Sequence, residues 1–223
     1  MRWTPVVAAV AAAAALWSAP TAAAVELCSG LGGVVEPDGI CRVHTEDPAF
    51  TLDVAFPIAY PDQTAVTDFI TTTRAEFIDE SRAPDARNLP HALEVKPLLD
   101  ATETTRSVTF EVYQNFGGAH PNTWFRSFNY DLAQNRVITL ETLFAAADPV
   151  DVIAPIVERD LTDRLGVPDL VSPSAGRDPA NYQNFSLTPE HVVFHFDRGS
   201  LLPGAAGAQI VHIPRSQLPP LAI

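Results

Sequence analysis

Apolar side chains alternate with polar ones along several short segments, and this period of two restricts the possible folds most. The alternation is clearest in residues 49–56, with Phe50, Leu52 and Val54, and in residues 108–112. Successive side chains of a β-strand point to opposite faces, so the pattern predicts strands with one buried face. Further strands are expected over residues 91–96, 124–130, 184–188, 191–197 and 208–214, with a turn at 134–135 and a short returning strand after it.

Two segments have the three- and four-residue spacing of amphipathic helices. The first lies within residues 60–81 and opens near Asp62. The second is predicted to begin with Asp148 as its cap and Pro149 in its first turn, and to end at Gly166. Strands joined by short turns dominate the order of elements. This order predicts an α+β fold, in which a largely antiparallel twisted sheet carries both helices on one face.

The first 24 residues contain the parts of a secretory signal peptide. Arg2 is followed by an apolar run over residues 6–17 and by the small residues Ala22, Ala23 and Ala24. The run is shorter than the roughly 20 residues that a membrane-spanning helix needs, and no later segment reaches that length. We expect cleavage after Ala24, export from the cell, and a single mature domain over residues 25–223.

Two cysteines, Cys28 and Cys41, lie at the start of the predicted mature chain. In an exported protein such a pair most simply forms one disulfide. The residues between them are mostly turn formers, so the bond would fasten the N-terminus to the fold. No metal site is expected, because His44 is the one nearby histidine and no second pair of ligands completes it. No cofactor is predicted either.

The chain is strongly acidic, with 27 Asp and Glu against 14 Lys and Arg and a formal net charge of -13. A negative surface repels phosphate backbones and anionic headgroups, which argues against nucleic acid and bare membrane as partners. A cationic protein would be attracted. The simpler interpretation is that the charge keeps an exported protein soluble.

Candidate catalytic residues are few. His191 and His195 are four apart, but the segment reads as a strand, which separates them by about 13 Å and prevents shared metal binding. A half-exposed strand face is expected for them. The chain has no G-x-S-x-G motif, so no serine is presented by a nucleophile elbow. A triad can still assemble from distant residues, and the candidates are Ser200, His120 and Asp178.

The stretch QNFGGAHPNTW, residues 114–124, connects two predicted strands. Gly117 and Gly118 suit a two-residue turn, and Pro121 places its strand end at an edge or bulge. The run lacks the G-x-G-x-x-G spacing and the lysine of phosphate-binding loops. It is either a turn alone or a loop that contacts a ligand through Gly117, Gly118, His120 and Pro121.

Several stretches together carry a family resemblance: FPIAYPDQ, VYQNFGGAHPNTW, FNYDLAQNRVITLETLF and DPANYQNFSLT. In this order and spacing the mature chain resembles the secreted immunogenic-protein antigens of mycobacteria and their small conserved secreted relatives. Residues from about 105 to 214 also resemble the C-terminal domain of RsiV anti-sigma factors, which some peptidoglycan deacetylases share. The resemblance implies a β-grasp-like α+β fold and a location in the culture fluid or at the cell wall.

The resemblance leaves two functions open. The RsiV domain is a receptor for lysozyme, a cationic protein, and this implies a binding or host-interaction protein whose partner is cationic or a cell-envelope component. Separately, we expect the protein to be a monomer. Some family members carry an esterase label, and this implies a cell-wall-associated serine esterase for short-chain acyl esters. No nucleophile can be carried over from the family, so Ser200, His120 and Asp178 remain candidates from this sequence alone.

Overall fold

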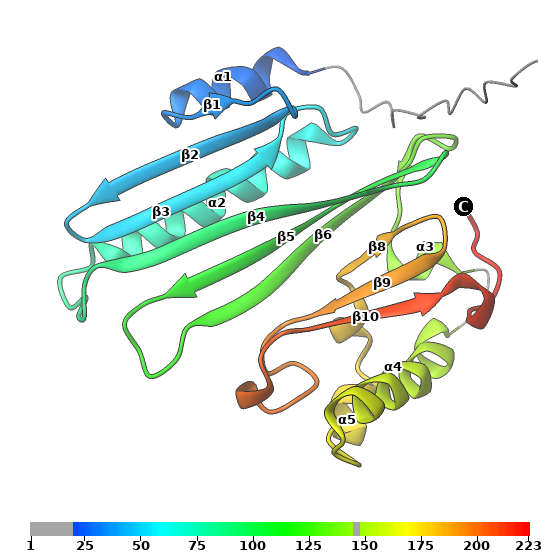
Figure 1. Ribbon diagram of the computed structural model, residues 1–223. Coiled ribbons are helices and arrows are strands. Elements are labelled where there is room, and N and C mark those ends of the chain that lie inside the picture. The colour runs from blue at the N-terminus through cyan, green and yellow to red at the C-terminus, as the bar shows by residue number, and fades with distance from the viewer. Residues whose placement is uncertain (1–19, 145–147) are drawn as a thin grey trace, which may run out of the picture.

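The computed structural model describes residues 20–144 and 148–223, which form two β-sheets with helices packed on them (Figure 1). Residues 1–19, most of the predicted signal peptide, lie outside the described part. The larger sheet has seven strands in chain order, and the smaller has three in the order β10-β9-β8. All named strand pairings are antiparallel except that between β3 and β4. The predicted fold class, α+β with a largely antiparallel sheet, is confirmed.

The larger sheet is built from long strands that follow each other along the chain. Its strands are β1 (Val34–Val35), β2 (Ile40–Asp47), β3 (Phe50–Pro57), β4 (His91–Ala101), β5 (Thr105–Asn115), β6 (Asn122–Asp131) and β7 (Arg136–Val137). Helix α2 (Gln63–Ser81) is the crossover between the parallel strands β3 and β4. It begins as predicted at Asp62, whose carboxylate accepts a hydrogen bond from the backbone N–H of Ala65 at 3.4 Å.

The predicted alternation places one face of the larger sheet against α2. Phe50, Leu52 and Val54 of β3 are buried there. The Phe50 ring meets Phe77 of α2 edge-to-face, with centroids 5.9 Å apart. Burying side chains of this size stabilises the fold by about 2 kcal/mol each. The remaining buried residues that share this core with β3 include Val66, Ile70, Leu93, Val95, Val108, Phe110 and Val112.

The predicted disulfide near the N-terminus is confirmed: Cys28 and Cys41 are bonded to each other, and both are buried. Cys28 lies in helix α1 (Ala22–Gly30), which begins at Thr21, and Cys41 lies in β2, a strand that the sequence did not predict. The predicted cleavage point after Ala24 falls inside α1, and Ala24 itself is 0% exposed and packs in the core. In this structure α1 therefore extends to both sides of that point.

The smaller sheet consists of β8 (Phe185–Leu187), β9 (His191–Phe196) and β10 (Gln209–Pro214), covered by helix α4 (Pro149–Leu165). The ends of α4 are as predicted: the carboxylate of Asp148 accepts the N–H of Val150 at 3.2 Å, and Gly166 ends the helix at φ 69°. The prediction that both helices share one sheet face is wrong, because each sheet has its own helix and its own apolar core. Shorter helical segments are α3 (Leu140–Leu143), α5 (Pro173–Gly176), η1 (Pro179–Tyr182), η2 (Gly204–Ala206) and η3 (Arg215–Gln217).

The two sheets meet on the face of the larger sheet that points away from α2. Strand β6 is an edge strand over most of its length, because β7 pairs only with Tyr130 and Asp131. Two side chains from the C-terminal half cap this edge: the carboxylate of Asp197 accepts the N–H of Phe125 at 2.8 Å, and the amide oxygen of Asn184 accepts that of Ser127 at 3.0 Å. These bonds satisfy backbone donors and block further strand pairing there.

Candidate functional site

The predicted catalytic residues lie in three different loops. The hydroxyl of Ser200 donates to the backbone carbonyl of Asp197 at 2.9 Å. The carboxylate of Asp178 caps η1 by accepting the N–H of Ala180 at 2.9 Å. His120 is exposed in the loop between β5 and β6. Within residues 20–144 and 148–223, no hydrogen bond joins any two of the three, so this structure does not assemble them as a triad.

The glycine loop is a six-residue connection over 116–121, so the predicted two-residue turn is wrong. Gly117 has φ 68°, and a Cβ there would lie 2.4 Å from the Cβ of Asn88. The side-chain amide of Asn88 also donates to the carbonyl of Gly117 at 2.7 Å. Gly117 is therefore needed for close approach to a neighbouring loop. Gly118, His120 and Pro121 are exposed, and their binding role stays a prediction.

One Ser, His and Asp cluster does form where the two sheets meet, and sequence reasoning missed it. It joins Asp100 at the end of β4, Ser186 of β8 and His195 of β9. The hydroxyl of Ser186 donates to Oδ2 of Asp100 at 2.7 Å and lies 3.3 Å from Nε2 of His195. Ser186 is 0% exposed and His195 is 3% exposed.

The hydrogen-bond order of this cluster is the reverse of a catalytic triad. In a triad the histidine lies between the carboxylate and the serine and accepts the serine proton. Here the single proton of Ser186 goes to Asp100, so Nε2 of His195 must donate to Ser186 instead of accepting. Nδ1 of His195 is then a bare lone pair, in agreement with its buried position and its lack of a hydrogen-bond partner. The arrangement links the sheets, and the hydroxyl of Ser186 has a carboxylate as its acceptor in place of the histidine of a triad.

Burial decides the charge of His195. Removal from water is the main cause that lowers the pKa of His195 to about 4, and the nearby charge of His212 is a smaller one. The ring is therefore neutral at pH 7. The sequence predicted β9 correctly but expected a half-exposed histidine face. His191 is half-buried, whereas His195 is buried because β8 and β9 pack against the larger sheet.

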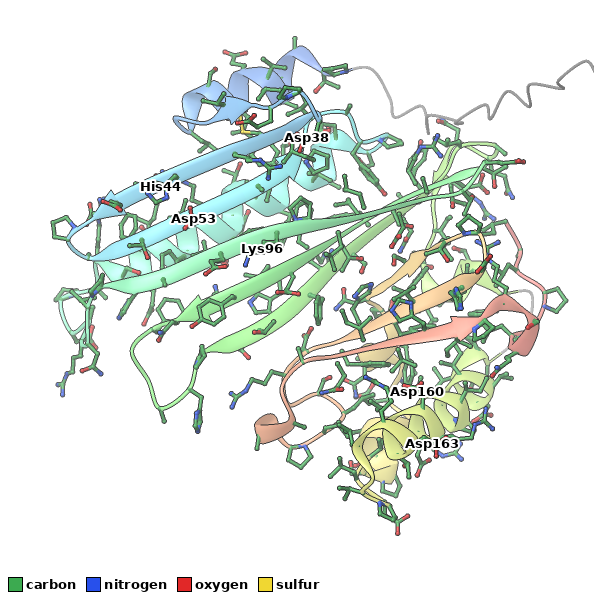
Figure 2. The ribbon with its side chains drawn as sticks, in the orientation of Figure 1. Asp38, His44, Asp53, Lys96, Asp160 and Asp163 are labelled. Atoms are coloured by element: carbon green, nitrogen blue, oxygen red, sulfur yellow. A yellow bond between two sulfur atoms is a disulfide. The ribbon has the colours of Figure 1, made fainter. Side chains whose placement is uncertain are left out.

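A second polar cluster lies on strands β2, β3 and β4, on the face of the larger sheet that points away from α2. Figure 2 labels its residues His44, Asp53 and Lys96. Nδ1 of His44 is 2.7 Å from Oδ1 of Asp53, and this hydrogen bond and the carboxylate charge raise the pKa of His44. A shallow hollow of about 370 Å³ lies over these residues. Nε2 of His44 points toward Glu46 at 3.6 Å, and no hydroxyl or thiol bonds to it in the described chain. The residues that line this hollow can bind polar groups, and none of them is a serine, threonine or cysteine.

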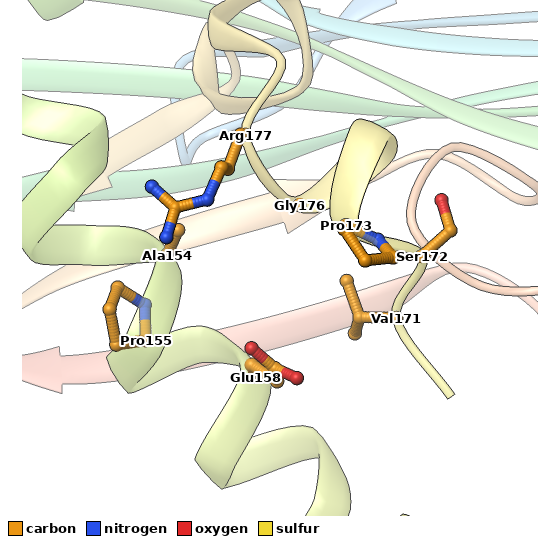
Figure 3. A pocket seen from close by; sticks show the side chains of 8 residues that line it. All are labelled: Ala154, Pro155, Glu158, Val171, Ser172, Pro173, Gly176 and Arg177. Atoms are coloured by element: carbon orange, nitrogen blue, oxygen red, sulfur yellow. The ribbon is translucent and has the colours of Figure 1, made fainter. Parts of the chain in front are cut away.

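A second hollow, of about 250 Å³, lies between α4 and α5 (Figure 3). Apolar Ala154 and Val171 line it together with the charged Glu158 and Arg177. The guanidinium of Arg177 donates to Asp151 at 3.0 Å across an exposed surface. Further along α4, Asp160 accepts a hydrogen bond from Arg164 at 2.7 Å, while Asp163 is exposed beside it (Figure 2). Among the described residues no group of three His, Cys, Asp or Glu side chains could hold a metal ion.

Comparison with known protein families finds a match for the C-terminal part of the chain. Residues 141–216, from α3 to η3, match the family model described as a protein of unknown function, DUF3298. A DUF3298-family crystal structure from Bacteroides fragilis superposes with a TM-score of 0.56 at 16% identity, covering 82% of this chain and 92% of that one. This likeness concerns the fold.

Two mycobacterial relatives align with nearly the whole chain. Esterase Rv3036c of Mycobacterium tuberculosis is 42% identical over 220 residues, which cover 96% of this chain and 97% of the relative. Immunogenic protein MPT64 of the same species is 36% identical over 203 residues, 89% of each chain. The chain therefore belongs to the family of these mycobacterial proteins, as the sequence stretches indicated. In the described part of the chain, every helix is too short or too polar to cross a membrane.

Proposed function

We propose that this protein is an exported binding or host-interaction protein that acts outside the cell or at the cell envelope without a catalytic serine. The observation that carries the proposal is the state of its Ser, His and Asp cluster. Ser186 is fully buried and donates to Asp100, and His195 is positioned as a donor. A hydrolase needs an accessible hydroxyl with a base beside it.

Family and charge support the same proposal. The relatives include immunogenic protein MPT64, and a disulfide is typical of proteins that leave the reducing cytosol. The net charge of -13 favours a cationic partner such as a lysozyme-like protein, or a cationic component of the envelope. We expect a monomer to be the binding form.

Titration with hen lysozyme tests this function. The protein is immobilised and lysozyme is added at 20 mM and at 300 mM salt, with an acidic protein of similar size as control. We expect saturable binding at low salt and clear weakening at high salt, since the Debye length falls below about 10 Å. Failure of lysozyme to bind saturably at low salt would rule out the cationic-partner proposal.

The second candidate is a serine esterase acting on short-chain acyl esters, and the 42% identity with Esterase Rv3036c favours it. For Ser186 to act as a nucleophile, the two sheets would have to separate where they meet. The ring of His195 would also have to rotate so that a nitrogen could accept the proton of Ser186. The assay is turnover of a chromogenic acetyl or butyryl ester by the protein and by its Ser186→Ala and Ser200→Ala variants. The esterase would be established if one of these changes abolishes the activity while the free energy of unfolding of the variant equals that of the parent.

A further inference from the structure

Residues of α2 and β6 line an aromatic groove on the face of the larger sheet that carries α2. Its volume is about 500 Å³. Phe69 of α2 forms its floor, with ring centroids 5.9 Å from Trp124 and 5.8 Å from Phe128 on β6. All three rings are half-buried, so each keeps part of its surface for a ligand.

The α2 wall of this groove is acidic. Asp68 and Glu76 line it and are both exposed. Across the described residues, no ion pair or side-chain hydrogen bond engages either carboxylate. Helix α2 carries two more exposed acids, Asp79 and Glu80, and a single arginine. The helix therefore presents unpaired negative charge beside exposed aromatic surface.

The spacing of the groups fits an extended chain. Eight residues of helix separate Asp68 from Glu76, which is about 12 Å along the axis. Four residues of strand separate Trp124 from Phe128, which is about 13 Å. A bound segment in extended conformation also advances about 13 Å over four residues, so side chains at its first and fifth positions can meet the two carboxylates.

We propose that the aromatic groove binds an extended segment of a cationic protein, with basic side chains four residues apart and an apolar side chain between them. The basic groups face Asp68 and Glu76, and the apolar group packs on Phe69. Exposed aromatic faces also attract lysine and arginine directly. The inference rests on the proposed binding function and locates its contact surface.

Arg126 gives the proposal a distinctive signature. It lines the groove, and its guanidinium lies over the Phe128 ring at 5.3 Å from the centroid. A basic ligand is repelled by this charge and competes with it for the ring. Replacing Arg126 with alanine should therefore strengthen binding of a cationic ligand about twofold to threefold, whereas a purely structural change would weaken it.

The test uses the full chain and the labelled peptide Lys-Thr-Leu-Thr-Lys, followed by fluorescence polarisation. Asp68→Asn and Glu76→Gln should each weaken binding about threefold to fivefold, the size expected for one exposed ion pair. Asp79→Asn is the matched control, because it removes the same charge from the same helix outside the groove, and it should change binding less than 1.5-fold. A peptide with adjacent lysines, Lys-Lys-Leu-Thr-Thr, should bind more weakly than the spaced one.

Trp124 supplies a second readout. Peptide binding should change the tryptophan fluorescence of the parent chain, in which Trp124 lines the groove, but not that of the Trp124→Phe variant. Equal effects of Asp79→Asn and Asp68→Asn, equal binding of the two peptides, or no saturation would overturn the proposal. Saturation of the groove by chitotriose in place of the peptide would overturn it in favour of a glycan. If lysozyme binds but the peptide does not, the groove proposal fails while the proposed binding function is retained, with its contact surface elsewhere on the protein.

Discussion

The neutral, buried state of His195 predicts a specific sensitivity of the fold to acid. The perturbation is the change from His195 to Gln, which keeps an N–H donor for Ser186 but removes the titrating ring. His195 is 3% exposed, its Nδ1 has no hydrogen-bond partner, and the charge of the nearby His212 disfavours a further positive charge on the ring. A proton added to this ring has no acceptor to stabilise it.

The magnitude follows from the two pKa values of His195. The ordinary value is 6.5, and burial lowers the pKa to about 4 in the folded protein. Because the unfolded chain binds the proton first, the stabilising contribution is complete above pH 6.5 and is lost as the pH falls toward 4. Each unit of pKa difference corresponds to about 1.4 kcal/mol, so the total loss is about 3 kcal/mol.

Urea unfolding at pH 7.5, 6.5, 5.5 and 4.5 measures this loss. Carboxylates titrate over the same range in both proteins, so the difference between the parent and His195→Gln isolates the histidine. Between pH 7.5 and 4.5 we expect the free energy of unfolding of the parent to fall by about 2.5 kcal/mol more than that of the variant. Parallel curves for the two proteins would refute the buried neutral histidine.

Two further predictions concern stability. Replacing both Cys28 and Cys41 with serine should lower the free energy of unfolding by about 3 kcal/mol, because the disulfide closes a loop with a sequence separation of 13; a loss below about 0.5 kcal/mol in urea unfolding would contradict this. Gly117→Ala should cost about 1–3 kcal/mol, since Gly117 has φ 68° and abuts Asn88, while the matched change Gly118→Ala, where a Cβ meets nothing within 4 Å, should be nearly neutral. Equal melting temperatures for these two glycine variants would argue against the close approach.

Local signals in the sequence were sufficient for helices α2 and α4, whereas α1 and the short helices α3 and α5 were not predicted. The cap at Asp148 and the end of α4 at Gly166 depend on neighbouring residues, and both are found as predicted. Strand β3 follows directly from its alternation. Strand β2 was missed because its exposed face carries Arg42, His44 and Glu46 and it follows a run of turn residues, which hid the underlying period.

Long-range pairing limited the prediction of sites. The sequence does not show that β8–β10 form their own sheet, so the expectation of one sheet with two helices failed. Asp100 and Ser186 are 86 residues apart, and only the packing of the two sheets brings them together. The pairing of His44 with Asp53 likewise depends on the register of β2 and β3. The glycine loop is one of the stretches that indicated the family. The structural reason for Gly117 is different: it allows the loop to pack closely against Asn88.

The most direct test of the central claim is exposure of the native protein to a fluorophosphonate, followed by intact mass spectrometry. This reagent forms a covalent adduct with a serine only where a neighbouring base activates the hydroxyl. Because Ser186 is buried and its hydroxyl donates to Asp100, we expect an unmodified mass under native conditions. A stoichiometric adduct on any serine, lost when the protein is unfolded beforehand, would contradict the binding-protein account and support the esterase.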